Sequence, residues 1–314
     1  MIGVSLLIIR LYTGYSITSQ EKLMGISSTE TPSVEVVIHP NTYSKTSVWI
    51  ALFFAIIIIG AWLLATPAGV LGKADAVGYA ICHRITVRSF EAFDRQLPLC
   101  ARCTGIYLGV VSGLMLLVAG GRSRAMRLPN WRILIVLGLF VVALGIDGFN
   151  SYFHLFPGFK GIYTPNNTLR LITGVFTGLT FINLLLPIFN SAVWAKVDNR
   201  APLENFKELA GMCLVACLVI AAALSERSGI LLIFGVVSTL GVVTVLTMIC
   251  SVMALALMQR NQSYVEWREL WLPLLIGLTI AITMIGGIDF LRYMFTGTWE
   301  GFNIDTSAFL VWRV

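Results

Sequence analysis

The sequence predicts an all-α protein, a polytopic transmembrane helical bundle of about seven spans with an additional interfacial helical segment. Two features of the composition predict it: of 314 residues, 57% are hydrophobic and only 12% are charged. A soluble domain carries about 25% charged residues. The third observation is that apolar stretches long enough to cross roughly 30 Å of hydrocarbon recur along the chain. With so few charges, most of the surface must face lipid.

Charge indicates which partners to expect. The formal net charge of +6 fits a protein that lies beside anionic lipid headgroups. The basic residues sit in short loops and form no soluble basic domain, which excludes nucleic acid as a partner. The predicted partners are therefore the lipid bilayer and other membrane protein subunits.

The chain divides into three regions. Residues 1–46 are polar enough to form an extramembrane N-terminal arm. The region 47–195 is predicted to hold four spans, and 196–314 holds three spans and a short tail. The predicted spans, in order, are 47–65, 103–119, 133–148, 169–194, 209–224, 229–258 and 270–290.

Glycines recur at helical spacing in two of the spans. Gly105, Gly109 and Gly113 lie on one face of the second span, and Gly174 and Gly178 lie one turn apart in the fourth. Small residues allow the backbones of two membrane helices to approach closely. The second and fourth spans are therefore predicted to pack against each other along these glycines.

The segment 67–103 carries the strongest indication of chemistry. Apolar positions such as Ile81 and Phe90 predict an amphipathic helix at the membrane interface. The same segment contains Cys82, His83, Cys100 and Cys103, with the last two in a Cys-x-x-Cys pair at the start of the second span. Pro98 and the residues between Cys82 and Cys100 allow the chain to double back, at a modest entropy of loop closure. We expect the three sulfurs to converge, with His83 in or just behind the cluster.

Three interpretations of these residues stay open. In the first, three thiolates and one imidazole bind zinc; because adjacent helical residues point about 100° apart, a three-thiolate site with His83 behind it is equally compatible. In the second, Cys100 and Cys103 are a redox pair whose thiolate a helix N-terminus favours, although only Cys82 is left as a relay. In the third, the cysteines are reduced, or form one inert bridge, and fasten the loop to the bundle. The pair does not match the attachment motif of covalent c-type haem, because Thr104 stands where the haem-ligating histidine would follow.

Polar residues gather at the span ends on the same side as the cysteines. One interpretation is structural: Asp289 pairs with Arg292, and Asp147 with Arg170 or Arg102. The other is functional, because charges at membrane depth usually have a partner or a role. It places one polar pocket on the outer face, formed by Arg84, Arg88, Arg102, Asp147, Asn166, Asn167, Arg170, Asp289 and Arg292.

Orientation follows from Lys and Arg near the span ends. The short loops on the N-terminal side carry more of them than those on the other side, when the cysteine segment is left out. This bias predicts a multi-pass protein of the cell (inner) membrane, with its N-terminus cytoplasmic and its C-terminus outside.

At the motif residues the sequence resembles an uncharacterised family of predicted prokaryotic membrane proteins, a domain of unknown function. The resemblance covers about residues 75–185. It rests on Cys82-His83, Arg88-Ser89-Phe90, the run from Leu99 to Gly109, Asp147-Gly148 and the run from Asn167 to Gly174. The family implies the site but no reaction. The arm and the last three spans lie outside the resemblance, which suggests a specialised member recruited into a larger assembly.

Two functions follow as hypotheses. The first is a non-catalytic subunit or scaffold of a membrane assembly, with a Cys/His metal or disulfide clip at the membrane surface. The second is a membrane-embedded thiol-redox or zinc-dependent enzyme with a polar pocket on the outer face. The only cofactor expected is zinc. The sequence does not decide whether the protein is an enzyme.

Overall fold

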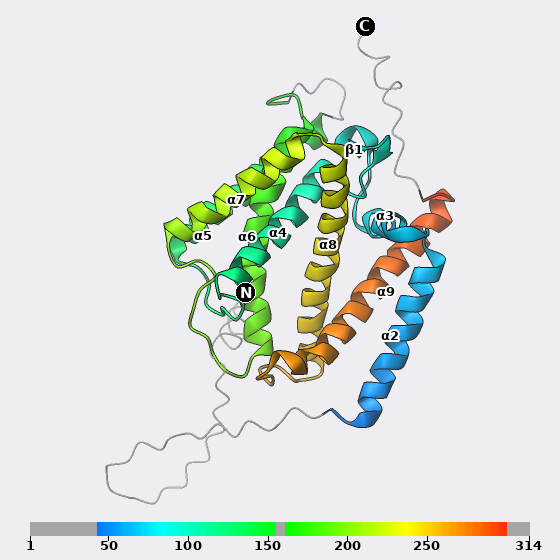
Figure 1. Ribbon diagram of the computed structural model, residues 1–314, viewed down its shortest axis with the longest axis vertical. Coiled ribbons are helices and arrows are strands. Elements are labelled where there is room, and N and C mark those ends of the chain that lie inside the picture. Colours follow the sequence, from blue (N-terminus) through cyan, green and yellow to red (C-terminus); the bar gives the residue numbers. More distant parts are fainter. Residues whose placement is uncertain (1–42, 155–160, 300–314) are drawn as a thin grey trace, which may run out of the picture. The chain divides into compact units, whose positions relative to one another are not determined.

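The computed structural model describes residues 43–154 and 161–299 of the protein. Almost all of the predicted N-terminal arm and most of the predicted tail lie outside the described residues. Within this part, seven helices are long and apolar enough to cross a membrane. They form a bundle (Figure 1), which confirms the predicted all-α polytopic class.

The spans begin and end close to the positions that the sequence predicts. They are α2 (Lys45–Ala65), α4 (Ala101–Ala119), α5 (Trp131–Phe153), α6 (Asn167–Val193), α7 (Phe206–Leu224), α8 (Ser228–Leu257) and α9 (Trp271–Thr296), the last preceded by the 3₁₀ turn η2 (Trp267–Leu270). Two helices run longer than predicted, since α5 continues to Phe153 and α9 to Thr296. Asp147 and Asp289 therefore lie within helices rather than at their ends.

The predicted contact between the second and fourth spans is present as a close helix crossing. A Cβ added at Gly105 would lie 2.5 Å from the Leu171 carbonyl oxygen, and one added at Gly178 would lie 2.9 Å from the Gly109 Cα. Backbones this close leave no room for side chains, so the crossing depends on glycine. It fixes α4 beside α6, and it brings the N-termini of both helices together.

The segment before α4 differs from its prediction. A helix is present, α3 (Gly69–Ile81), but it ends before Cys82. A 3₁₀ turn η1 (Thr86–Arg88) and a short hairpin of β1 (Glu91–Ala92) with β2 (Arg95–Gln96) follow it. Phe93 and Asp94 form the hairpin turn at φ 53° and 55°, the left-handed geometry that two-residue hairpin loops use. Phe90, predicted to be helical, lies beside this hairpin and is buried in the core.

The C-terminal half of the chain supports this segment. α8 packs against α4 and α9, α9 packs against α2, and α3 packs against both α8 and α9 (Figure 1). Along α2 only Ala55 is buried, as expected of a helix that faces lipid on most sides. Because consecutive spans alternate in direction, α4, α6 and α8 begin at the end of the bundle where α2, α5, α7 and α9 finish. We call this the motif end, since α3 and the hairpin lie there.

Candidate metal centre

The three cysteines of the motif come together at the motif end. The sulfurs of Cys82, Cys100 and Cys103 all lie within 4.8 Å of one another. Cys82 is buried, and the other two are partly buried. The predicted convergence of the three sulfurs is present in the structure.

Two helix termini bring the sulfurs to one place. Cys82 is the C-cap of α3 and Cys100 is the N-cap of α4, while Cys103 lies in the first turn of α4. The backbone N–H of Cys100 donates a hydrogen bond to the Cys82 sulfur at 3.4 Å. A Cβ at Gly78 would overlap the Pro98 carbonyl oxygen, so α3 can reach the start of α4 only with glycine at this position.

The surroundings favour a thiolate. Hydrogen bonds from the thiols of Cys100 and Cys103, and from the backbone N–H groups of Arg84 and Cys100, lower the pKa of the Cys82 thiol. The positive end of the α4 dipole acts in the same direction. A thiolate is the form of cysteine that binds metal ions.

Arg292 connects α9 to the end of α3. Its guanidinium donates hydrogen bonds to the carbonyls of Tyr79 and, at 2.8 Å, Cys82, and it lies over the Tyr79 ring at 4.0 Å. Carbonyls at a helix C-terminus lack the N–H partners that helix-interior carbonyls have, and a cation is favourable there. Arg292 therefore holds the backbone of Cys82 against α9.

The donor set fits a soft or borderline metal ion. Tetrahedral zinc with Zn–S bonds of about 2.3 Å separates its sulfurs by about 3.8 Å, and the observed limit of 4.8 Å is close to that arrangement. His83 is exposed and is not among the three metal-capable side chains of this group. Its predicted role in or behind the site stays a prediction.

The hairpin is held against α3 by ion pairs. Asp75 of α3 pairs with Arg84 at 3.0 Å and with Arg95 of β2. Gln96 donates to the Arg84 carbonyl at 2.9 Å. Arg84, predicted to line a polar pocket, is buried here as part of the support for the cysteine segment.

Asp147 of α5 is the centre of a second polar group. It accepts hydrogen bonds from Arg102 of α4, from Nε at 3.1 Å, and from the Tyr163 hydroxyl at 2.9 Å. Arg102 was one of the two partners expected for it. Ser151, one turn further along α5, receives bonds from Arg102 and from Arg88.

The start of α6 lies beside this group. Asn166 caps the helix, since its side chain accepts from the Leu169 N–H at 2.8 Å. Asn167 bonds to Arg170 at 2.8 Å and donates to the carbonyls of Val87 and Ser89, on either side of Arg88. Arg102, Arg88 and Arg170 thus belong to one neighbourhood, which we call the arginine cluster.

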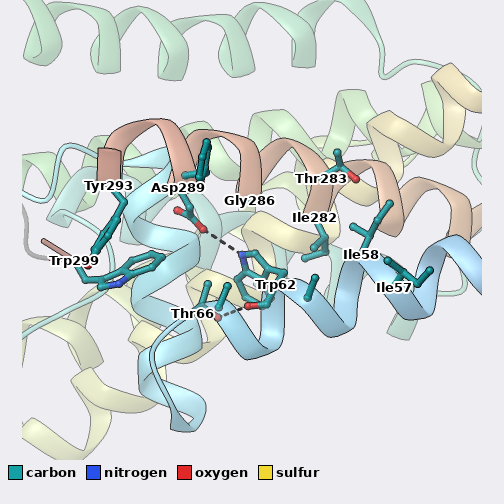
Figure 2. A pocket seen from close by; sticks show the side chains of 13 residues that line it. Ile57, Ile58, Trp62, Thr66, Ile282, Thr283, Gly286, Asp289, Tyr293 and Trp299 are labelled. Carbon is teal, nitrogen blue, oxygen red and sulfur yellow. Dashed lines mark hydrogen bonds between the residues drawn. The ribbon is translucent and has the colours of Figure 1, made fainter. Parts of the chain in front are cut away.

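Asp289 lies in different surroundings. It is 2% exposed and accepts a hydrogen bond from the Trp62 indole at 3.1 Å. Both residues line a largely apolar cavity of about 560 Å³ between α2 and α9 (Figure 2). Of the residues predicted to form a polar pocket, only Asp289 lines this cavity. The expected Asp289–Arg292 ion pair is not formed within the described residues, because Arg292 points to the end of α3 instead.

The structure therefore distributes the predicted pocket residues among several groups: the support of the cysteine segment, the arginine cluster, and the cavity beside α2. Sequence reasoning missed Asp75, Tyr163 and Trp62 as partners. Asp75 and Tyr163 lie outside the spans in regions with no periodic pattern that identifies them. Trp62 is indistinguishable in sequence from an ordinary interfacial tryptophan.

Comparisons with known proteins find the motif in a family of predicted membrane proteins. The family described as predicted membrane protein (DUF2085) matches residues 82–184. An uncharacterised protein of Methanocaldococcus jannaschii is 34% identical over 122 residues, which is 38% of this chain and 71% of that protein. One of Methanothermobacter thermautotrophicus is 34% identical over 101 residues, 32% of this chain and 78% of that protein. No solved structure matches the chain.

Proposed function

The chain belongs to the DUF2085 family of predicted membrane proteins, and from this premise we propose that it is a non-catalytic membrane subunit with a zinc clip. In this proposal Cys82, Cys100 and Cys103 bind one zinc ion as thiolates. The ion fastens α3 and the hairpin to the start of α4, and so presents this segment to partner subunits at the membrane surface.

The observation that carries the proposal is the convergence of the three sulfurs within 4.8 Å. They come from two elements with a long loop between them, so a shared ion would link two parts of the fold. Metal binding to thiolates is coupled to folding and contributes on the order of 10 kcal/mol in zinc-finger peptides. An ion at this position would therefore stabilise the segment strongly.

Burial favours a structural role over a catalytic one. Cys82 is 6% exposed and packs with Leu99 and Val242 in an apolar cluster. Arg292, Gly78 and the Asp75 ion pairs all hold the segment in place from outside the sulfurs. This is the arrangement expected of a fastening between elements.

A zinc-dependent or thiol-redox enzyme is the second candidate, and one observation favours it. Within the described residues the metal-capable group offers three side chains, and catalytic zinc typically has three protein ligands and one open position. The Cys100–Cys103 pair at a helix N-terminus is also where a redox disulfide would form.

Elemental analysis and thiol counting of the detergent-purified protein test both candidates. We expect one zinc per chain, and loss of that zinc in Cys82→Ser, Cys100→Ser and Cys103→Ser, each with a clearly lower thermal midpoint. Cys217→Ser is the matched control, since this cysteine is exposed on α7 and should change neither quantity.

Other outcomes separate the alternatives. Zinc that is lost without a change in the thermal midpoint would contradict the clip and favour the catalytic site. Metal-free protein in which two of the six cysteines become titratable only after reduction would favour the redox pair. Metal-free protein with every thiol titratable after denaturation alone would exclude both zinc and a disulfide.

A further inference from the structure

The arginine cluster consists of cationic hydrogen-bond donors, whereas the cysteines are metal-binding thiols, and the zinc proposal assigns the arginines no role. Arg88 and Arg102 both donate to Ser151, to its carbonyl at 3.4 Å and to its hydroxyl at 3.3 Å respectively. Two guanidinium groups that share one serine lie close to each other. Burial and the neighbouring Arg102 charge lower the pKa of Arg88, as expected where cations are crowded together.

Arg170 joins them through the crossing of α4 and α6. A Cβ at Gly174, one turn beyond Arg170, would lie 2.5 Å from the Arg102 carbonyl oxygen. Arg170 also bonds to Asn167, whose amide donates to the carbonyls on both sides of Arg88. The backbones of α4 and α6 are thus in direct contact, and the Asn167 side chain connects α6 to the backbone on either side of Arg88.

The cluster has an excess of positive charge. Within the described residues the carboxylate bonded to it is Asp147, which already accepts from Arg102 and Tyr163. The N-termini of α4 and α6 add positive partial charges at the same end of the bundle. Three cations and two helix dipoles thus face the Asp147 carboxylate, and the Cys100 sulfur also lies near enough to interact electrostatically with Arg88 and Arg170.

The arginine cluster also has N–H groups that are available to donate hydrogen bonds. Arg170 is 6% exposed, and its Nε atom has no hydrogen-bond partner among the residues that the structure describes. A guanidinium has five N–H donors. Within the described residues the Arg170 guanidinium donates one hydrogen bond, to the Asn167 side chain, and that of Arg88 donates one, to the Ser151 carbonyl. A buried cationic donor without a partner is energetically costly. A bound anion would supply hydrogen-bond acceptors and a compensating negative charge.

We propose that Arg88, Arg102 and Arg170 form a binding site for a phosphate group. Arginine binds phosphate through paired N–H donors, and phosphate has enough acceptor oxygens to engage several arginines together. The site lies at the beginning of α4 and α6, and the headgroups of a bilayer lie at the ends of membrane spans. A lipid phosphate and a free phosphate ion share the chemistry that this site recognises.

Binding to the intact, detergent-purified chain tests the proposal, with two kinds of probe. One arm titrates inorganic phosphate against sodium chloride of equal ionic strength. The other adds phosphatidic acid or, as a control with the same tails and no phosphate, diacylglycerol. We expect the phosphate-bearing probe of at least one arm to raise the thermal midpoint and to bind in calorimetry, while chloride and diacylglycerol do neither.

The variants Arg88→Gln and Arg170→Gln should each weaken this binding by at least about tenfold, since each removes charge-assisted hydrogen bonds. Arg227→Gln is the matched control, an exposed arginine at the same end of the bundle, and should bind like the unchanged protein. Arg88 is only partly buried, so its variant is expected to fold and tests the site even if Arg170→Gln does not.

Each outcome of these binding measurements either supports or contradicts the phosphate site. Binding of phosphatidic acid alone supports a lipid headgroup as the source, and binding of inorganic phosphate supports a free ion. Failure of both phosphate probes, or equal binding by Arg88→Gln and the unchanged protein, overturns the proposal. Neither outcome bears on the zinc site, whose test is metal content.

Discussion

At the scale of single residues, the Asp147–Arg102 ion pair contributes to the stability of the motif end. The side chain of Asp147 is 1% exposed and that of Arg102 is 23% exposed. A charge removed from water is tolerated only when its partner stays in place. The pair also joins α4 to α5, both of which pack against α6.

We predict that Arg102→Met destabilises the protein by about 3–5 kcal/mol, because it leaves the Asp147 carboxylate buried with one cation fewer. Unfolding in mixed detergent–SDS micelles measures the change. The double variant Arg102→Met/Asp147→Leu should recover most of the loss, since it removes both charges. Glu204→Gln, which breaks an exposed pair with Arg122, is the control and should have little effect. A double variant less stable than the single one would contradict the argument.

At the scale of elements, two close contacts between helix backbones determine where the residues of the motif end lie. The α4–α6 crossing places the arginine cluster, and the α3–α4 approach places the cysteines. Both depend on glycine for lack of space rather than for backbone freedom, because no positive φ is involved at Gly78, Gly109 or Gly178.

We predict that Gly109→Ala destabilises the bundle by about 1–3 kcal/mol, the range for overpacking a filled interior. Its new Cβ would overlap the Val175 carbonyl and lie 3.1 Å from the Gly178 Cα. Gly138→Ala in α5 is the matched control, because nothing lies within 4 Å of its added Cβ. That variant should gain up to about 1 kcal/mol from helix propensity. The two substitutions should therefore shift the SDS unfolding midpoint in opposite directions, and equal shifts would argue against the crossing.

Gly78→Ala should act on the metal rather than only on stability. The methyl group would push α3 away from Pro98 and so separate Cys82 from Cys100. We expect reduced zinc content or, in competition with a chromophoric chelator, at least about tenfold weaker binding, as seen when supports of metal ligands are altered. Gly60→Ala in α2, with open space around its added Cβ, should keep full zinc. Full metal content in Gly78→Ala would show that the approach does not position the site.

At the scale of the whole molecule, orientation is the main open prediction. The excess of Lys and Arg in loops on the N-terminal side predicts that the motif end faces outside. Single cysteines added at exposed positions on the two sides report it: Ile162→Cys at the motif end and Lys196→Cys at the other. In intact cells an impermeant maleimide should label Ile162→Cys above the background of the native cysteines, and Lys196→Cys only after the membrane is opened. The reverse pattern would invert the assignment.

The number and class of the spans could be read from the sequence, because an apolar stretch of sufficient length must cross the bilayer as a helix whatever its neighbours are. The glycine spacing was equally informative, since periodicity within one helix identifies a face. The pairing of two such faces then followed from their shared small residues. For the same reason Cys100 and Cys103, one turn apart, were recognisable as a pair.

The contacts between distant segments were decided only by tertiary structure. No local sequence pattern predicts that Arg292 binds the end of α3 rather than Asp289. Nor does one predict the hydrogen bond from Trp62 to Asp289, which are 227 positions apart in the sequence. The hairpin replaced a predicted helix because its ion pairs with Asp75 and its buried Phe90 outweigh a weak local preference. The sequence by itself determined which segments form long apolar helices and where cysteine and charged residues concentrate along the chain. The tertiary structure decided which of those residues meet, because long side chains bind whatever buried carbonyl, carboxylate or indole the packing brings within their reach.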